Sequence, residues 1–267
     1  MSMNAYAVRI EGDMNPDRHL LATPSYVFVG DNPLEPGTES KGLLTTAGSL
    51  IKHKDKYYLV AGGKQVQDCG WIDPLWEFNS QDPSSEDSER KVVASYHIGR
   101  VISDSEVFST RLIEVDNEIY PGEETTIDHV CYLHDDHDGV SNYLDVVDYI
   151  RENYIQPGGF VGGMNIRVYR GDGTNIDGVI LDDEHTFYRH GGGEIGVFAS
   201  CDMAKAVERL VEPRDCGAWF QEIDGYWCGQ VAGYSGQRMW AICLDDRSYT
   251  EHLGRAIEPG KQFLRTE

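Results

Sequence analysis

Pro213-Arg214-Asp215-Cys216-Gly217-Ala218-Trp219 is the stretch of sequence that decides the fold of this chain. It predicts a turn that presents the Cys216 side chain as a nucleophile. Short apolar runs separated by turn residues follow it, with strands expected at residues 219–220, 226–233 and 238–244 and turns at 223–225 and 233–236. This alternation of short strands and Gly-containing turns is typical of an all-β protein.

The same stretch resembles the last part of the chymotrypsin/trypsin-like proteases, in particular the acidic trypsin-like proteins of fungi. Their pattern there is G-D-S-G-A-W-V, a hairpin and a G-x-I-V-A-G strand, and Cys216 stands at the position of their serine. Three further stretches are similar to the family: its V-x-K-x-G-R-T-T-G-x-T-x-G-x-V hairpin at residues 165–179, its His-bearing hairpin at 46–63 and its Asp-bearing strand at 107–115. The resemblance covers residues 25–245 and implies an all-β fold with minor helices, a chymotrypsin-like double β-barrel.

The catalytic triad of that family is degenerate in this chain. The family carries A-G-H at the end of its His-bearing hairpin, whereas this chain has Gly63 at the His position and Lys64 after it. Ser109 occupies the position of the family's Asp, and Arg214 replaces a Gly two residues before the nucleophile. The resemblance therefore implies that the triad His and Asp are lost and that the Ser is replaced by Cys216.

Cys216 is the candidate nucleophile, because a thiol is partly ionised near neutral pH and depends less on a neighbouring base than a serine hydroxyl does. The turn residues Arg214, Asp215 and Gly217 would form the oxyanion region, through backbone N–H groups or through the guanidinium of Arg214. Three side chains are candidates for a replacement base: His97, His190 and Lys64. The alternative is a Cys216 that is simply a small buried side chain, since Cys is among the most buried residue types.

The resemblance also implies where a substrate would bind. Val231, Ala232 and Gly233 correspond to the strand that lines the family's cleft. Leu210 lies six residues before Cys216, where trypsins carry the Asp at the base of their specificity pocket. A preference for Arg or Lys is therefore not inherited by that route.

The chain has 267 residues and a formal net charge of -22, so it is long enough for two small β-barrels and strongly acidic. The acidity argues against a broad nucleic-acid interface and against anionic membranes, and it is compatible with cationic partners or with solubility alone. No apolar run has the length of a membrane span, the N-terminus does not resemble a signal peptide, and the six Cys show no paired spacing. We therefore expect a cytoplasmic protein with reduced thiols.

No cofactor and no metal site are predicted. The one metal-like cluster, His129, His134 and His137 with neighbouring Asp residues, lacks the fixed spacing of a zinc motif. We interpret it as a solvated acidic loop.

The chain is divided by these patterns into five segments: an N-terminal arm at 1–24, a first β-barrel at 25–118, a connector with a helix at 119–157, a second β-barrel at 158–248 and a tail at 249–267. The connector helix is predicted from the spacing of Val140, Leu144, Val147, Ile150 and Tyr154. Shorter helices are expected at residues 203–210 and 250–257, and an acidic, Ser-rich loop at 81–89.

Three functions are compatible with the sequence. In the first, Cys216 forms a thioester and transfers an acyl group from an activated donor, for example in aminoacyl transfer or cyclodipeptide formation from aminoacyl-tRNA, because loss of the triad His disfavours amide hydrolysis. In the second, the protein is a catalytically inactive pseudoprotease that acts as a binding module. In the third, it is an atypical cysteine protease whose base comes from elsewhere in the chain. The partner would be a small-molecule, peptide or aminoacyl substrate, with nucleic acid only as a charged-tRNA donor.

Overall fold

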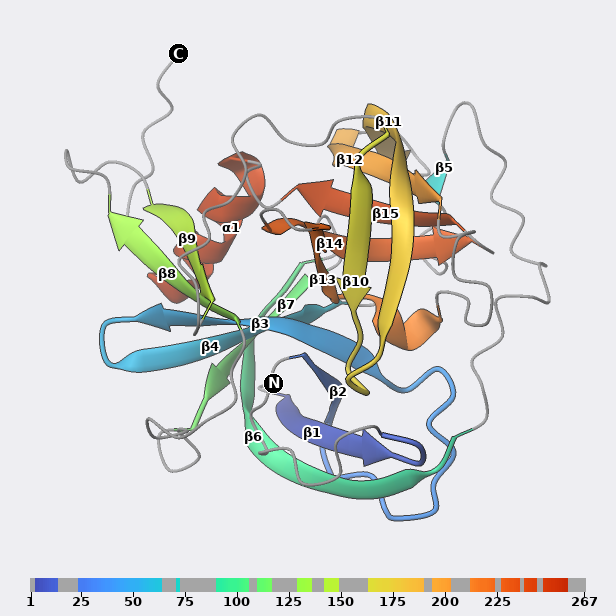
Figure 1. Ribbon diagram of the computed structural model, residues 1–267. Coiled ribbons are helices and arrows are strands. Elements are labelled where there is room, and N and C mark those ends of the chain that lie inside the picture. The colour runs from blue at the N-terminus through green and yellow to red at the C-terminus, as the bar shows by residue number, and fades with distance from the viewer. Residues whose placement is uncertain are drawn as a thin grey trace.

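The computed structural model of the chain is shown in Figure 1. It describes residues 3–13, 24–63, 71–72, 90–105, 110–116, 129–135, 142–148, 163–189, 194–202, 212–223, 227–235, 238–243 and 247–258. The described chain is mostly β-strand, arranged in two sheets, with one α-helix near the C-terminus. The all-β character expected from the sequence is therefore confirmed.

The first sheet contains the N-terminal strands and is antiparallel except where β8 joins β3. Its strands are β1 (Asn4–Ile10), β2 (Ser25–Gly30), β3 (Thr45–His53), β4 (Lys56–Gly62), β6 (Val92–Ser105), β7 (Thr110–Val115), β8 (His129–Asp135) and β9 (Asn142–Asp148). They are ordered β2-β1-β6-β7-β4-β3-β8-β9, and β2 also pairs with β3, so six strands form a hydrogen-bonded ring. Small and branched apolar residues of β1, β3, β4 and β7 fill its core, among them Ala5, Ala47, Leu59 and Ile113.

The second sheet lies above and to the right of the first in Figure 1. Its strands are β5 (Trp71–Ile72), β10 (Asn165–Tyr169), β11 (Asn175–Arg189), β12 (Glu194–Asp202), β13 (Trp219–Glu222), β14 (Trp227–Ser235) and β15 (Arg238–Cys243). The order is β10-β13-β14-β15-β12-β11-β5, and β10 also pairs with β11, which again gives a ring of six strands. The consecutive strands β10, β11 and β12 pair with their neighbours in the chain, and β13 then returns to pair with β10. These four strands therefore form a Greek key.

The helix expected in the connector is wrong for residues 142–148, which form β9. The strand pairs with β8 at every position from Asn142 to Asp148, and β8 itself pairs in parallel with β3. Val146 and Val147 are β-branched and fit a strand better than a helix. The spacing of apolar residues is therefore overridden by pairing with a strand that precedes β9 in the sequence. The remainder of the expected helix, residues 140–141 and 149–154, lies outside the described residues.

Two other boundaries differ from expectation. β1 pairs with both β2 and β6, so residues 4–10 are an interior strand of the first sheet and not an arm. β5 falls within the segment expected to form the first barrel, yet it pairs with β11 of the second sheet. The helix expected at 203–210 and the acidic loop at 81–89 lie outside the described residues. Within the part of the chain that is described, no helix has the length and apolar character needed to cross a membrane.

The expected C-terminal helix is confirmed as α1 (Arg247–Ile257), and it contacts β9 of the first sheet and β14 of the second. Near its start, Tyr249 is fully buried and donates to the side chain of Gln230 on β14, which also accepts from Thr110 of β7 at 3.4 Å. Just after its end, Glu258 lies 2.9 Å from Nε2 of His53 and also binds Lys54 in the β3–β4 turn. α1 therefore ties the second sheet to the far end of the first.

The two sheets meet where backbone lies directly against backbone. A Cβ atom added to Gly62 at the end of β4 would lie 2.3 Å from the carbonyl oxygen of Cys216, and one added to Gly48 of β3 would lie 2.6 Å from the carbonyl oxygen of Gly217. Gly217 has a φ of +94° and faces the amide nitrogen of Gly62 and the carbonyl oxygen of Thr46. Only glycine fits these positions, so the turn after Asp215 is seated on β3 and β4 without side chains in between.

Replacing Gly217 with Ala should destabilise the protein far more than replacing Gly37. Both glycines have positive φ, +94° and +89°, but an added Cβ at Gly217 would lie 2.0 Å from the Gly62 nitrogen while one at Gly37 meets nothing within 4 Å. Gly37→Ala should cost roughly 1–2 kcal/mol from its φ alone, and Gly217→Ala at least about 3 kcal/mol more. Urea unfolding of the two variants measures the difference, and equal losses would contradict the close backbone contact.

Candidate functional site

The residues around Cys216 form a tight turn, here named the Cys216 turn and comprising residues 212–217. Pro213–Asp215 is a single 3₁₀ turn that starts at proline, whose fixed φ suits a first helical position. The amide of Cys216 donates to the carbonyl of Pro213 at 3.2 Å, and the amide of Ala218 donates to the carbonyl of Asp215 at 2.9 Å. Local hydrogen bonds therefore close the turn just before β13 begins.

The Cys216 side chain is not at a surface. Its residue is only 1% exposed, and it belongs to the apolar cluster of the second sheet with Ala218, Phe220 and Val231. Its sulfur forms no disulfide. In this conformation the sulfur packs as a small apolar group, in agreement with the second of the two interpretations of Cys216.

The backbone N–H and C=O groups of the Cys216 turn form hydrogen bonds within the protein. The amide of Gly217 donates to the carbonyl of Val231 at 2.8 Å. The carbonyl of Cys216 accepts from the amide of Thr46 at 2.8 Å, and the carbonyl of Arg214 accepts from the Thr46 hydroxyl at 2.6 Å. An oxyanion hole needs N–H groups directed at the reacting atom. Here the amides of Cys216 and Gly217 are bonded within the protein instead.

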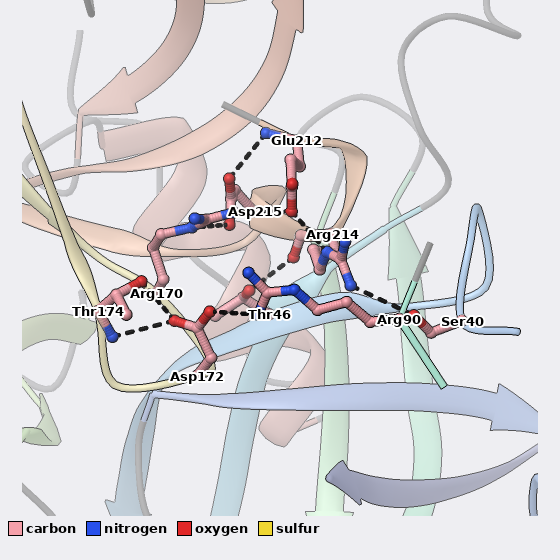
Figure 2. A network of polar contacts seen from close by, with 9 residues as sticks. All are labelled: Ser40, Thr46, Arg90, Arg170, Asp172, Thr174, Glu212, Arg214 and Asp215. Atoms are coloured by element: carbon pink, nitrogen blue, oxygen red, sulfur yellow. Dashed lines mark hydrogen bonds and ion pairs between the residues drawn. The ribbon is translucent and has the colours of Figure 1, made fainter. Parts of the chain in front are cut away.

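A charged network surrounds the turn, and Figure 2 shows it. Asp215 is fully buried, and its two carboxylate oxygens accept from Nε of Arg170 and from the amide of Glu212, both at 2.8 Å. The carboxylate of Glu212 accepts from Nη2 of Arg170 at 2.9 Å and from Nε of Arg214 at 2.7 Å. Glu212 thus holds both arginines with one oxygen.

The network continues to the segments that precede β3 and β6 of the first sheet. Arg214 donates to the hydroxyl of Ser40 at 3.2 Å, and Arg90 donates to Asp172 at 2.9 Å. Asp172 lies in the β10–β11 turn, where it also accepts from the amide and hydroxyl of Thr174. Three guanidinium groups (Arg90, Arg170, Arg214) therefore face three carboxylates (Asp172, Glu212, Asp215), which balances the charge at the junction of the two sheets.

Burial and ion pairing shift the pKa values of Arg170 and Asp215 in opposite directions. Burial opposes the charged form of Arg170, but Asp215 and Glu212 outweigh it and raise the pKa of the guanidinium, so Arg170 is charged. Burial raises the pKa of Asp215 against the attraction of Arg170. Because both oxygens of Asp215 already accept hydrogen bonds, we assign it the ionised form.

Tyr26 completes the buried side of the network. Its ring lies 5.8 Å from the Arg214 guanidinium and packs against Gly171, and burial followed by the charge of Asp215 raises the pKa of the phenol. Tyr26 is therefore neutral and supplies an apolar wall with a cation–π contact.

The structure brings some of the sequence-predicted site residues together. Gly63, which the sequence resemblance aligns with a catalytic His, directly follows Gly62, whose backbone touches that of Cys216 and Gly217. Val231, Ala232 and Gly233 all lie on β14, with Val231 bonded to the turn.

Other predicted residues lie elsewhere or are not described. Lys64, Ser109, Leu210 and His190 lie outside the described residues. His97 is wrong as a replacement base: it is paired with Asp116 at 3.2 Å on the outside of the first sheet, while Cys216 is buried in the second. Among the residues that the structure describes, no group of three or more His, Cys, Asp or Glu could hold a metal ion. The cluster of His129, His134 and His137 was interpreted from the sequence as a solvated acidic loop. That interpretation is wrong for residues 129–135, which form the strand β8.

Sequence reasoning missed Arg170, Asp172, Glu212 and Arg90. Arg170 and Asp172 flank Gly171 in a hairpin turn, where charged residues are ordinarily solvent-exposed. The signal for their burial is the pairing of charges between segments far apart in the chain, and a single sequence does not contain it.

Comparison with known proteins gives no family assignment, since no protein-family model and no curated protein matches the chain.

Asp215→Ala should destabilise the protein by about 3–5 kcal/mol, because it leaves the buried guanidinium of Arg170 without its main partner. The matched control is Asp177→Ala, which breaks the Arg167–Asp177 pair at 2.7 Å on a surface where the two side chains are 38% and 40% exposed. A surface pair of this kind contributes less than about 1 kcal/mol. Urea unfolding compares them, and similar losses would argue against a buried ionic network.

Asp172 should make the protein sensitive to acid. Burial alone would raise its pKa, but hydrogen bonds from Thr174 and the charges of Arg170 and Arg90 outweigh burial and lower it. The folded state therefore binds the proton less tightly than the unfolded state. Its stabilising contribution is present above the unfolded pKa of about 4 and is lost as the pH falls through the folded pKa.

Between pH 5 and pH 2, unfolding free energy should fall with a steeper slope for the wild type than for Asp172→Asn, by up to about 1.4 kcal/mol per pH unit. Urea titrations at each pH measure both slopes. Parallel curves would mean that Asp172 has the same proton affinity in the folded and unfolded chain.

Proposed function

We propose that this protein is a catalytically inactive relative of the chymotrypsin-like proteases that acts as a binding module. Two rings of six strands, one of them containing a Greek key, support a chymotrypsin-like double β-barrel. The sequence resemblance around Cys216 supports the same architecture. The position of Gly63 beside the Cys216 turn supports the correspondence with the family's catalytic centre.

The burial of Cys216 in the apolar cluster of the second sheet is the observation that carries this proposal. A nucleophile has to reach the substrate carbonyl, and a thiol becomes reactive in an electropositive, partly exposed site. The Cys216 amide is bonded to Pro213, so the turn also lacks a donor that an oxyanion hole would use. Acyl transfer through Cys216 would require the turn to rearrange.

The net charge of -22 indicates which partners such a module would favour. A field of this sign attracts cationic surfaces and repels nucleic acids and anionic membranes. We therefore propose a basic polypeptide as the partner, bound without chemical turnover.

Cys216 in the folded protein should react with limiting iodoacetamide at least about a hundredfold more slowly than in urea, because alkylation needs the turn to open. Mass spectrometry of the labelled peptides measures the rate, with Cys216→Ser identifying the peptide. Hydrolysis of p-nitrophenyl acetate, an activated acyl donor, should be equal for the wild type and Cys216→Ser. Fast, selective labelling of Cys216 together with hydrolysis that Cys216→Ser abolishes would instead establish the acyl-transfer function.

The binding part of the proposal has its own measurement. A lysine-rich peptide, titrated into the protein at low and high salt, should bind at low salt and weaken steeply as screening increases. The absence of binding at either salt concentration would remove the basic polypeptide as partner.

A further inference from the structure

We propose that the outer edge of β6 between Val93 and His97 is the docking surface of this protein, and that an extended segment of a basic polypeptide adds to it as a further strand. The proposal rests on the proposed function and deepens it, because it gives the place and the mode of binding. β6 is the long curved strand at the lower side of the first sheet in Figure 1.

This edge of β6 lies between two points at which it is already paired. At Val92 it exchanges two backbone hydrogen bonds of 2.8 Å with the loop before β3, one with Gly37 and one with Thr38. At Ile98 its carbonyl accepts from the amide of Asp116 at 3.0 Å, and beyond this point β6 pairs with β7. In the part of the chain that the structure describes, no backbone group bonds to this edge between those two points.

The inner edge of the same segment is paired. Residues 94–97 of β6 lie opposite residues 6–9 of β1 in an unbroken antiparallel register. In such a pair, alternate residues direct their N–H and C=O groups to the partner strand, and the residues between them direct theirs to the other edge. Residues 93–97 therefore present donors and acceptors along roughly 16 Å, at about 3.3 Å per residue, which suits a short extended segment.

The open segment lacks the residues that usually protect an edge strand. Edges are commonly blocked by Lys, by Pro or by other charged side chains. Residues 93–97 include no Pro, Lys, Arg, Asp or Glu, in a chain of which 25% is charged. Among the described residues four large apolar side chains are exposed, and two of them are Val93 at 50% and Tyr96 at 36%. Strand addition uses both features, because backbone bonds give affinity and side-chain contacts give specificity.

Charge selects the occupant of this edge. A second copy of the chain would present the same edge, but two molecules that each have a net charge of -22 repel one another. A basic polypeptide is attracted by the same field. Asp116, whose side chain is 49% exposed and lies 3.2 Å from His97, offers a carboxylate to such a partner at one end of the segment.

A peptide of seven alternating Lys and Val residues, labelled with a fluorophore, tests the mode of binding to the full-length chain. Its control is the same peptide N-methylated at every residue, which keeps the charge and the side chains but has no backbone N–H. Anisotropy titrations at low salt should give at least about tenfold weaker binding for the methylated peptide, since several backbone hydrogen bonds are lost. Equal affinities would overturn strand addition and leave the basic partner of the proposed function in place, whereas no binding of either peptide would remove both.

Tyr96→Lys and Met3→Lys test the place of binding. Both residues are 36% exposed, and Met3 lies on the other side of β6, where its carbonyl accepts from the amide of Val101. Tyr96→Lys should weaken binding of the unmethylated peptide at least about tenfold, and Met3→Lys should leave it within about twofold, because a lysine blocks an edge only where it stands on it. Equal losses would overturn the proposal, since the peptide would then respond to net charge alone.

Hydrogen exchange locates the contact directly. Amides of residues 93–97 that face the outer edge should exchange rapidly in the free protein and at least about tenfold more slowly when the peptide is bound. Slow exchange in the free protein would mean that another segment of the chain, or a second copy, covers the edge. Protection by the peptide confined to other strands would place its binding elsewhere. Either result would overturn the proposal.

Discussion

The buried charge at the junction of the two sheets is the constraint on which the rest of the structure depends. Arg170, Asp172, Arg214 and Asp215 are each no more than 1% exposed, and charged groups removed from water are tolerated only when they are paired. Each of these four has its opposite charge within 2.9 Å. The pairs of Arg170 and Arg214 shape the Cys216 turn within the second sheet, whereas the Arg90–Asp172 pair joins segments of the two sheets and constrains how they meet.

This constraint explains why a turn that resembles a catalytic centre is closed. A nucleophile turn must leave amides and a reactive side chain directed at a cleft. In this chain the corresponding amides and carbonyls bond to Pro213, Val231 and Thr46, and glycine at positions 62 and 217 brings the two backbones into contact. The two amides that would serve a substrate are bonded within the turn and to β14, and the carbonyl of Cys216 joins the turn to Thr46 of the first sheet.

What the sequence predicts well is local, and what it misses depends on contacts between distant segments. The strands around the hairpins β3–β4 and β14–β15, and helix α1, follow from short apolar runs and turn residues that lie next to one another in the chain. β9 was missed because its identity depends on pairing with β8. The burial of Cys216 does not follow from the sequence for a similar reason: its turn is held by distant segments, such as Arg170, which is 45 residues from its partner Asp215.

The network also bears on why polar groups fill a junction that apolar residues could fill. Apolar side chains of similar volume often stabilise such a site as well as an ion pair does, so stability alone does not account for six charges there. Apolar surfaces tolerate sliding, whereas the Arg90–Asp172 ion pair and the hydrogen bond from Arg214 to Ser40 are directed contacts between segments of the two sheets. The bonds from Arg170 to Asp215 and Glu212 hold the Cys216 turn against the β10–β11 hairpin of its own sheet. We therefore interpret the network as an element that shapes the Cys216 turn and also favours one docking of the two sheets.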